Sequence, residues 1–203
     1  GIALEYISFD SSDPAADICE VARSKRSDYV VLGLHRPVLG QNPFGGTVGK
    51  VLADSPAPVA LLVDHGLARS FGRSARGAAG KRVVVPVCGV PGDELALNFA
   101  ERLLSDEAVS VKVAFVGPQP AAGDAVKLRS ERLRAKYAER VQFRTISASA
   151  GLVALRDCAA EADLLVLGLG AAWGLEVERA SADSGRLFAE FPTSLLVLHA
   201  PTA

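Results

Sequence analysis

The chain has 203 residues, 49% of them hydrophobic, and a mean hydropathy of +0.25, so it can bury a substantial core and global disorder is excluded. A net charge of −1 gives it no general attraction for nucleic acid or for anionic membrane surfaces. Its apolar runs, such as "DLLVLGL" at 163–169, are far shorter than the roughly 18 residues that a membrane helix needs. The composition therefore predicts one large globular domain or two small ones.

The cysteine and methionine counts bear on the redox compartment of the chain and on whether it is a fragment. Cys19, Cys88 and Cys158 are an odd set without CxxC spacing, which predicts thiols in a reducing compartment rather than disulfides or zinc ligands. The chain has no methionine, although a complete gene product begins with one. We therefore expect the sequence to be a fragment of a longer protein.

The predicted elements alternate between apolar runs and helical patterns. In chain order they are strand 3–9, helix 13–26, strand 28–34, helix 47–54, strand 57–63, strand 81–87, helix 92–104, strand 109–116, helix 123–140, strand 141–147, strand 163–169 and strand 194–199. Most of these strands are near-continuous runs of Val, Leu and Ile, which is typical of parallel strands covered on both faces. The alternation predicts βαβ units and a doubly wound sheet.

Two helix starts are marked by residue type. Asp13 is the expected N-cap of the first helix, with Pro14 at its first position. Asp93 and Glu94 stand at the positive end of the helix at 92–104. The basic helix that follows is interpreted as a solvated surface helix rather than a nucleic-acid site.

The two halves of the sequence resemble each other across a basic, glycine-rich segment. "DYVVLGL" at 28–34 and "DLLVLGL" at 163–169 match at five of seven positions, and each leads through a helix to a final apolar strand. We interpret this as an internal duplication. The expected organisation is an incomplete first unit at 1–66 that holds only its last three strands, a flexible linker at 67–80 and a complete second unit at 81–203.

The loop after the second predicted strand is a candidate anion site. Gly46 and Thr47 stand at the expected start of a helix, where free N–H groups, the helix dipole and a hydroxyl favour phosphate. Gly33, His35 and Arg36 would lie near the carboxyl end of the sheet, where doubly wound folds bind ligands. Paired glycines before a helix are also an ordinary tight turn, so the residues alone leave both readings open.

Gly33, Gly46 and Thr47 fit the spacing G-x2-G-x9-G-[S/T], and the chain resembles the universal stress proteins, in which this pattern binds ATP. Arg36 departs from the pattern, because the family has its second glycine there. A closer resemblance is to the tandem domains in the cytosolic tails of cation/proton antiporters. It runs through "VVLGLHRPVLG", "FGGTVGKVLADSPAPVALLVDHG" and "VVVPVCGVPGDELALNFAERLL" and covers nearly all of both units.

The resemblance implies an α/β fold of universal-stress-protein-like, doubly wound parallel sheets, similar to the adenine nucleotide α-hydrolase class. It implies one and a half repeats that associate through their final strands. The ligand it implies is ATP or another adenine nucleotide at the first unit, with no metal beyond a magnesium ion bound to that nucleotide. In the second unit Ala171, Ser181 and Ala182 replace the pattern residues, and "PVCG" at 86–89 lacks the family's acidic residue, so we expect this unit not to bind ATP.

The function that the resemblance implies is a regulatory domain on the cytoplasmic face of the cell membrane, the tail of a monovalent cation/proton antiporter. It would sense an adenine nucleotide and modulate transport. The implied partners are the membrane transport domain of the same polypeptide and a second copy in a homodimer. The alternative is a free-standing tandem universal stress protein that binds ATP. No enzyme is expected, since no residue set is arranged for acid–base or nucleophilic work, and Cys88 and Trp173 are interpreted as structural residues.

Overall fold

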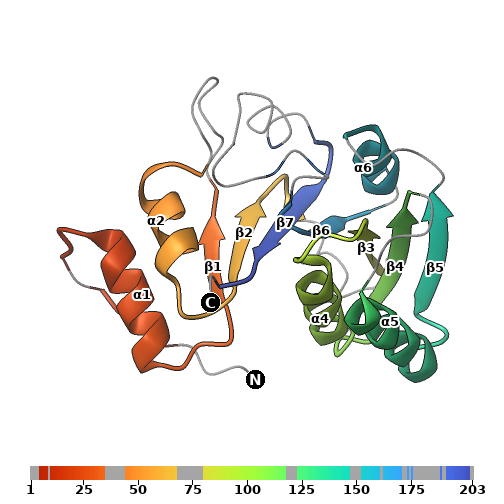
Figure 1. The fold of residues 1–203 in the computed structure, drawn as a ribbon, viewed down its shortest axis with the longest axis horizontal. Helices are drawn as coiled ribbons and strands as arrows, with labels where there is room; N and C mark the ends of the chain where they lie inside the picture. The colour runs from red at the N-terminus through yellow and green to blue at the C-terminus, as the bar shows by residue number, and fades with distance from the viewer. Residues whose placement is uncertain are drawn as a thin grey trace.

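The computed structural model describes residues 5–8, 10–34, 44–67, 80–117, 123–146, 152–160, 162–170, 173, 175, 188 and 191–201. These residues form one seven-stranded sheet with helices on both faces (Figure 1). The strands are β1 (Val30–Gly33), β2 (Val59–Val63), β3 (Lys81–Val87), β4 (Val109–Val116), β5 (Val141–Ile146), β6 (Leu164–Gly168) and β7 (Ser194–His199). The helices are α1 (Pro14–Ser24), α2 (Gly46–Asp54), α4 (Asp93–Leu103), α5 (Asp124–Lys136) and α6 (Leu152–Ala159).

The strand order β1-β2-β7-β6-β3-β4-β5 joins two parallel sets through one antiparallel pair. β2 and β7 are the last strands of the two predicted repeats, and Leu61 lies opposite Val197 in their register. Among the named strands every other pairing is parallel. The predicted α/β class is confirmed. The two expected sheets are one continuous sheet, and the association of final strands occurs inside the chain.

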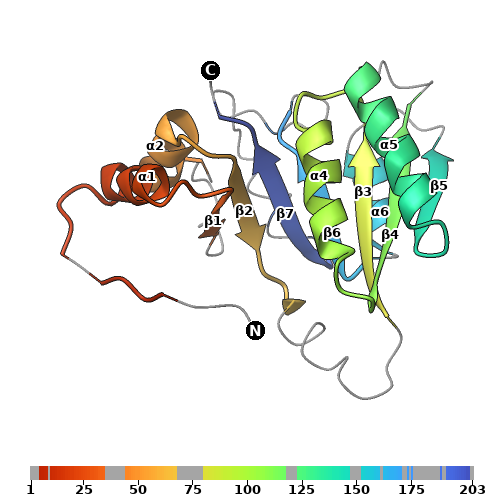
Figure 2. The same cartoon turned by 90° about the horizontal axis from the view of Figure 1, so that it is seen from below.

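Each face of the sheet carries its own core because side chains alternate along a strand. On one face α1, α2 and α6 pack against residues such as Val84 and Leu165. On the other face α4 and α5 pack against residues such as Val83 and Val166. Figure 2 shows α4 and α5 in front of β3, with α6 behind the sheet.

The helix starts follow the predicted capping chemistry. The Asp13 carboxylate accepts a hydrogen bond from the Ala16 N–H at 3.4 Å, and Pro14 is the first residue of α1. α4 begins at Asp93, and α2 begins at Gly46, one residue before the predicted start. Local sequence therefore determines these helix boundaries closely.

The strand predicted at 3–9 is wrong for its described residues, 5–8, which are in no strand. Tyr6 is 91% exposed, and Glu5 pairs with Lys25 at 3.0 Å instead of joining the sheet. An apolar, β-branched run forms a strand only if a neighbouring strand satisfies its backbone groups. Among the described residues this segment has no such neighbour.

Two further predictions concern the linker and the cysteines. The expected linker at 67–80 lies outside the described residues except for its two ends. Cys19, Cys88 and Cys158 form no disulfide with one another. None of the helices in the described ranges is long and apolar enough to cross a membrane.

Candidate functional site

The predicted anion site lies at the carboxyl end of β1. Gly33 ends that strand and is exposed, and a Cβ built on it meets no atom of the described residues within 4 Å. A helix that links two parallel strands starts on the side where the first strand ends, so the N-terminus of α2 lies at the same edge as Gly33. The fold therefore brings Gly33, Gly46 and Thr47 to one edge of the sheet.

Among the described residues no side chain caps the N-terminus of α2. Its N-cap, Gly45, is extended and makes no side-chain cap hydrogen bond, and the first turn contains no acidic residue. Gly46 and Thr47 are exposed. Backbone N–H groups in the first turn of a helix lack intrahelical acceptors, so this end favours an anion.

The backbone geometry of this segment also favours glycine at two positions. Gly46 has a φ of +59°, a backbone conformation that favours glycine. A Cβ on Gly49 would lie 2.2 Å from the carbonyl oxygen of Phe44. The tight-turn interpretation is thus correct for part of the motif, and it is compatible with a bound anion. His35 and Arg36, the other two predicted site residues, lie outside the described residues.

At the corresponding edge of the second repeat, the β3–α4 turn packs against the end of β6. Gly168 matches Gly33 in the internal duplication. A Cβ on Gly168 would lie 2.3 Å from the carbonyl carbon of Gly92, and one on Gly170 would lie 2.6 Å from a methyl of Val90. The β3–α4 turn therefore packs against the carboxyl end of β6, beside the place between β3 and β6 where the strand order reverses and where ligands of doubly wound folds bind.

Asp93 occupies the donors of that turn. Its Oδ2 accepts hydrogen bonds from the backbone N–H groups of Cys88, Gly89 and Val90 at 2.9, 2.7 and 3.1 Å. Successive N–H groups of this kind form a concave anion-binding arrangement. Here the group that the N–H groups bind is an internal carboxylate. The sequence analysis placed Asp93 only at a helix start. Gly89, four residues before it, was the available sequence signal for a turn, and the structure gives this glycine a φ of +90°.

The surroundings of Asp93 change the acidity of two groups. Asp93 is fully buried, and its Oδ1 has no hydrogen-bond partner. Burial raises the pKa of this carboxyl to about 6, although the three N–H bonds act in the opposite direction. Burial and the Asp93 charge raise the pKa of the Cys88 thiol to about 12. Cys88 is consequently protonated at neutral pH and unsuited to act as a nucleophile.

Trp173 and His65 make contacts inside the fold. Trp173 is 2% exposed and packs in the core, as predicted. His65 contacts the Phe188 carbonyl oxygen through its ring Nε2 at 2.9 Å, and the backbone N–H of His65 donates to the Ser194 hydroxyl. Among the described residues no three His, Cys, Asp or Glu side chains lie together as a metal site would require.

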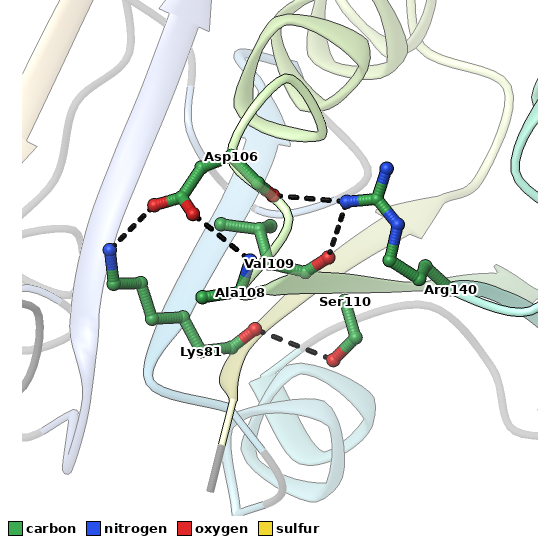
Figure 3. A network of polar contacts seen from close by, with 6 residues as sticks. All are labelled: Lys81, Asp106, Ala108, Val109, Ser110 and Arg140. Atoms are coloured by element: carbon green, nitrogen blue, oxygen red, sulfur yellow. Dashed lines mark hydrogen bonds and ion pairs between the residues drawn. The ribbon is translucent and has the colours of Figure 1, made fainter. Parts of the chain in front are cut away.

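A network of polar contacts lies at the amino ends of β3, β4 and β5 (Figure 3). Lys81 Nζ lies 2.7 Å from Asp106 Oδ2, and Asp106 Oδ1 accepts the Ala108 N–H at 2.9 Å. Arg140 donates to the carbonyl oxygens of Asp106 and Val109 at 3.0 and 3.3 Å. These bonds join the turns at the amino ends of β3, β4 and β5, so this network stabilises the fold at the end of the second repeat opposite the β3–α4 turn.

Comparison with known sequences relates this chain to transporters. No family model matches it. It is 30% identical over 132 residues to Cation/H(+) antiporter 23, chloroplastic, of Arabidopsis thaliana, which is 61% of this chain and 15% of the antiporter. It is 32% identical over 104 residues to Cation/H(+) antiporter 17 of the same plant, 48% of this chain and 13% of that protein. The chain thus matches a small part of each antiporter.

Comparison with solved structures identifies the fold. A universal stress protein from Archaeoglobus fulgidus DSM 4304 matches 93% of this chain and 66% of its own, with a TM-score of 0.59 and 16% identity. A protein of unknown function from Pseudomonas aeruginosa PAO1 matches 95% of this chain and 69% of its own, with a TM-score of 0.50 and 16% identity. The fold is that of the universal stress proteins, and the sequence is similar to a part of cation/H+ antiporters, as the motifs indicated.

Proposed function

We propose that this chain is a non-catalytic regulatory domain of a monovalent cation/proton antiporter. The observation that carries the proposal is the similarity over 132 residues to a cation/H+ antiporter, in a chain with the fold of the universal stress proteins. In this arrangement the domain lies on the cytoplasmic side, and its partner is the transport domain of the same polypeptide.

The ligand in this proposal is ATP or another adenine nucleotide at the carboxyl end of β1. The phosphates would take the free N–H groups at Gly46 and Thr47 and the Thr47 hydroxyl. Gly33, which has open space in place of a Cβ, would let the nucleotide approach the strand. His35 and Arg36 would flank the ligand, and magnesium would arrive only with the nucleotide.

Regulation requires that the nucleotide bind one arrangement of the antiporter better than another. The domain would transmit this difference to the transport domain, alone or as a homodimer. Because β2 and β7 already pair with each other, a homodimer would use a surface other than the final strands. The oligomeric state is measured by analytical ultracentrifugation.

Titration calorimetry with ATP, ADP and AMP tests the ligand. Thr47→Asp puts a negative charge at the exposed start of α2 and should weaken nucleotide binding by about tenfold or more, since the new carboxylate would repel the phosphates. Thr145→Asp adds the same charge at an exposed position of β5 and serves as the matched control. Absence of binding at millimolar nucleotide would remove the ligand from the proposal.

A transport measurement tests the proposed regulation of the antiporter by this domain. In vesicles that contain the whole antiporter, deletion of this domain should change the rate of cation/proton exchange or its response to ATP. The second candidate, a free-standing tandem universal stress protein, is favoured by the 93% coverage of this chain in the Archaeoglobus structure. Ten to twelve hydrophobic spans upstream, each of about 20 residues, would decide for the antiporter.

A further inference from the structure

A polar groove lies along α4 and α5, which pack against each other on one face of the sheet (Figure 2). Its volume is about 530 Å³. Both predicted repeats contribute to its lining, because Tyr29 precedes β1 whereas the helices belong to the second repeat. The charged side chains that line it are Glu101, Arg102, Arg129 and Lys136.

Two cations of the groove converge on Glu101. Its carboxylate lies 2.8 Å from Arg129 Nη1 and 3.3 Å from Lys136 Nζ. The Glu101 side chain is 18% exposed and the Arg129 side chain is 23% exposed, so solvent and salt screen this contact less than they screen a surface pair. One carboxylate between two cations leaves a positive charge uncompensated among the described residues of the groove. The arrangement also shows that the groove accommodates a carboxylate.

Arg102 brings a third cation to the groove. Its guanidinium Cζ lies 5.1 Å from the centroid of the Tyr29 ring, and its Nη1 lies 3.3 Å from Asp28 Oδ2. The Arg102 and Asp28 side chains are 57% and 75% exposed, and exposed pairs of this kind contribute little to stability. Arg102 can therefore exchange Asp28 for the carboxylate of a bound partner at little cost.

Aromatic rings and an amide with an unpaired oxygen complete the lining. Tyr29 packs edge-on against Phe99, with the ring centroids 5.3 Å apart, and Tyr137 lines the groove at the end of α5. Tyr and Arg are enriched where proteins bind one another. Asn98 Oδ1 is buried and has no hydrogen-bond partner in the described part of the chain. If this amide turned toward a donor N–H in the groove, it would gain a hydrogen bond.

We propose that this groove binds an acidic segment of a separate partner protein, whose carboxylates face Arg102, Arg129 and Lys136. Such a segment carries both kinds of group that the lining calls for. Its carboxylates match the excess of cations, and its backbone N–H groups match the unpaired oxygen of Asn98. The phosphodiesters of lipids and nucleic acids offer acceptors and no such donor, so they match the lining less well.

The partner is distinct from the transport domain of the proposed function. Cytoplasmic loops of membrane proteins carry an excess of Lys and Arg, which the cations of the groove would repel. The inference goes beyond the proposed function and does not depend on a nucleotide, since Gly33, Gly46 and Thr47 are not among the residues that line the groove.

Fluorescence anisotropy with a labelled hexaglutamate peptide tests the proposal. The chain should bind hexaglutamate, more weakly at about 200 mM than at about 20 mM NaCl because salt screens charge contacts. It should not bind hexaglutamine. Arg102→Gln combined with Lys136→Gln should weaken hexaglutamate binding by about tenfold or more, because two charge-assisted contacts are lost.

Arg23→Gln combined with Lys25→Gln is the matched control. These side chains are 58% and 50% exposed, and each pairs with a glutamate; Arg102 and Lys136 are both 57% exposed and also pair with carboxylates. Because α1 packs on the opposite face of the sheet, the control should change binding by less than about twofold. All four side chains are exposed, so both double variants should fold.

Glu101→Gln gives a change of the opposite sign. It removes the internal carboxylate that competes for Arg129 and Lys136, so hexaglutamate should bind about threefold more tightly or better, a gain that loss of folding does not produce.

Three results would overturn the proposal. The first is absence of hexaglutamate binding, and the second is equal weakening by the two double variants. The third is tighter binding to duplex DNA, or to phosphatidylcholine vesicles with about 30% phosphatidylserine, that the Arg102→Gln and Lys136→Gln pair abolishes. That result would assign the groove to a nucleic acid or a membrane surface.

Discussion

Asp93 concentrates the unusual chemistry of this chain in one side chain. Its carboxylate is fully buried, holds three backbone N–H groups through one oxygen, and leaves the other oxygen without a partner. The turn that it organises contacts Gly168. One residue therefore binds the three N–H groups that shape the β3–α4 turn.

The raised pKa of Asp93 predicts the direction of a pH effect on stability. Burial moves this pKa from 3.8 to about 6, so the folded state binds the proton more tightly than the unfolded state. The contribution of Asp93 to the free energy of unfolding is greatest below about pH 4 and falls as the pH rises to about 6. The loss is on the order of 3 kcal/mol. Urea denaturation from pH 4 to pH 7 measures it.

Asp93→Asn should remove this part of the pH dependence, because the amide does not titrate. The matched control is Asp64→Asn. Asp64 accepts N–H bonds from Gly66 and Leu67 that lower its pKa, so its contribution is lost only as the pH falls below about 4. Parallel pH profiles for the wild type and Asp93→Asn would contradict the prediction.

At the scale of elements, the same strand–loop–helix pattern has two different environments. Gly33 and Gly168 both follow a "VL" pair and end a parallel strand. No atom of the described residues lies within 4 Å of a Cβ built on Gly33, whereas Gly168 contacts the backbone of Gly92. Identical local sequence thus serves as an accessible edge in one repeat and as a packed contact in the other.

Alanine substitution at the two glycines should separate these roles. Gly168→Ala forces a Cβ to 2.3 Å from the Gly92 backbone and should lower the free energy of unfolding by about 1–3 kcal/mol. Gly33→Ala meets nothing within 4 Å and should change it by less than about 0.5 kcal/mol. Equal losses in the two variants, measured by urea denaturation, would refute the proposed difference in packing.

At the scale of the whole molecule, the β2–β7 pair unites the repeats. Five residue pairs, from Val59↔His199 to Val63↔Leu195, join the two parallel sets. One hydrophobic core contains residues from α1 and α2 together with residues from α6 and β7. Shared burial of this kind favours a single cooperative unfolding transition.

Trp173 makes this cooperativity measurable. It lies in the second repeat, is buried, and is the only tryptophan of the sequence. Leu61→Ala, a fully buried change in the first repeat, should cost about 2–5 kcal/mol and lower the urea midpoint seen by Trp173 fluorescence. Circular dichroism should report the same midpoint. A Trp173 midpoint that stays at the wild-type value would mean that the repeats unfold independently.

The sequence by itself determined the local elements and the type of fold. Near-continuous apolar runs predicted six of the strands and an alternating pattern predicted β5. Asp13 and Pro14 predicted the start of α1, and the matching "VLGL" phrases predicted the duplication. These features depend on short-range periodicity and capping, which a single sequence contains. For the candidate site the sequence predicted Gly46 at a helix start, which the structure confirms.

Only the tertiary structure decided how these elements meet. The antiparallel β2–β7 pair, the unpaired segment at 5–8 and the Asp93 carboxylate inside its turn all depend on neighbours distant in sequence. A strand forms when another strand satisfies its backbone, and a buried carboxylate is held by donors that folding brings to it. Periodicity does not contain this information, because it describes the propensity of a segment and not its partner.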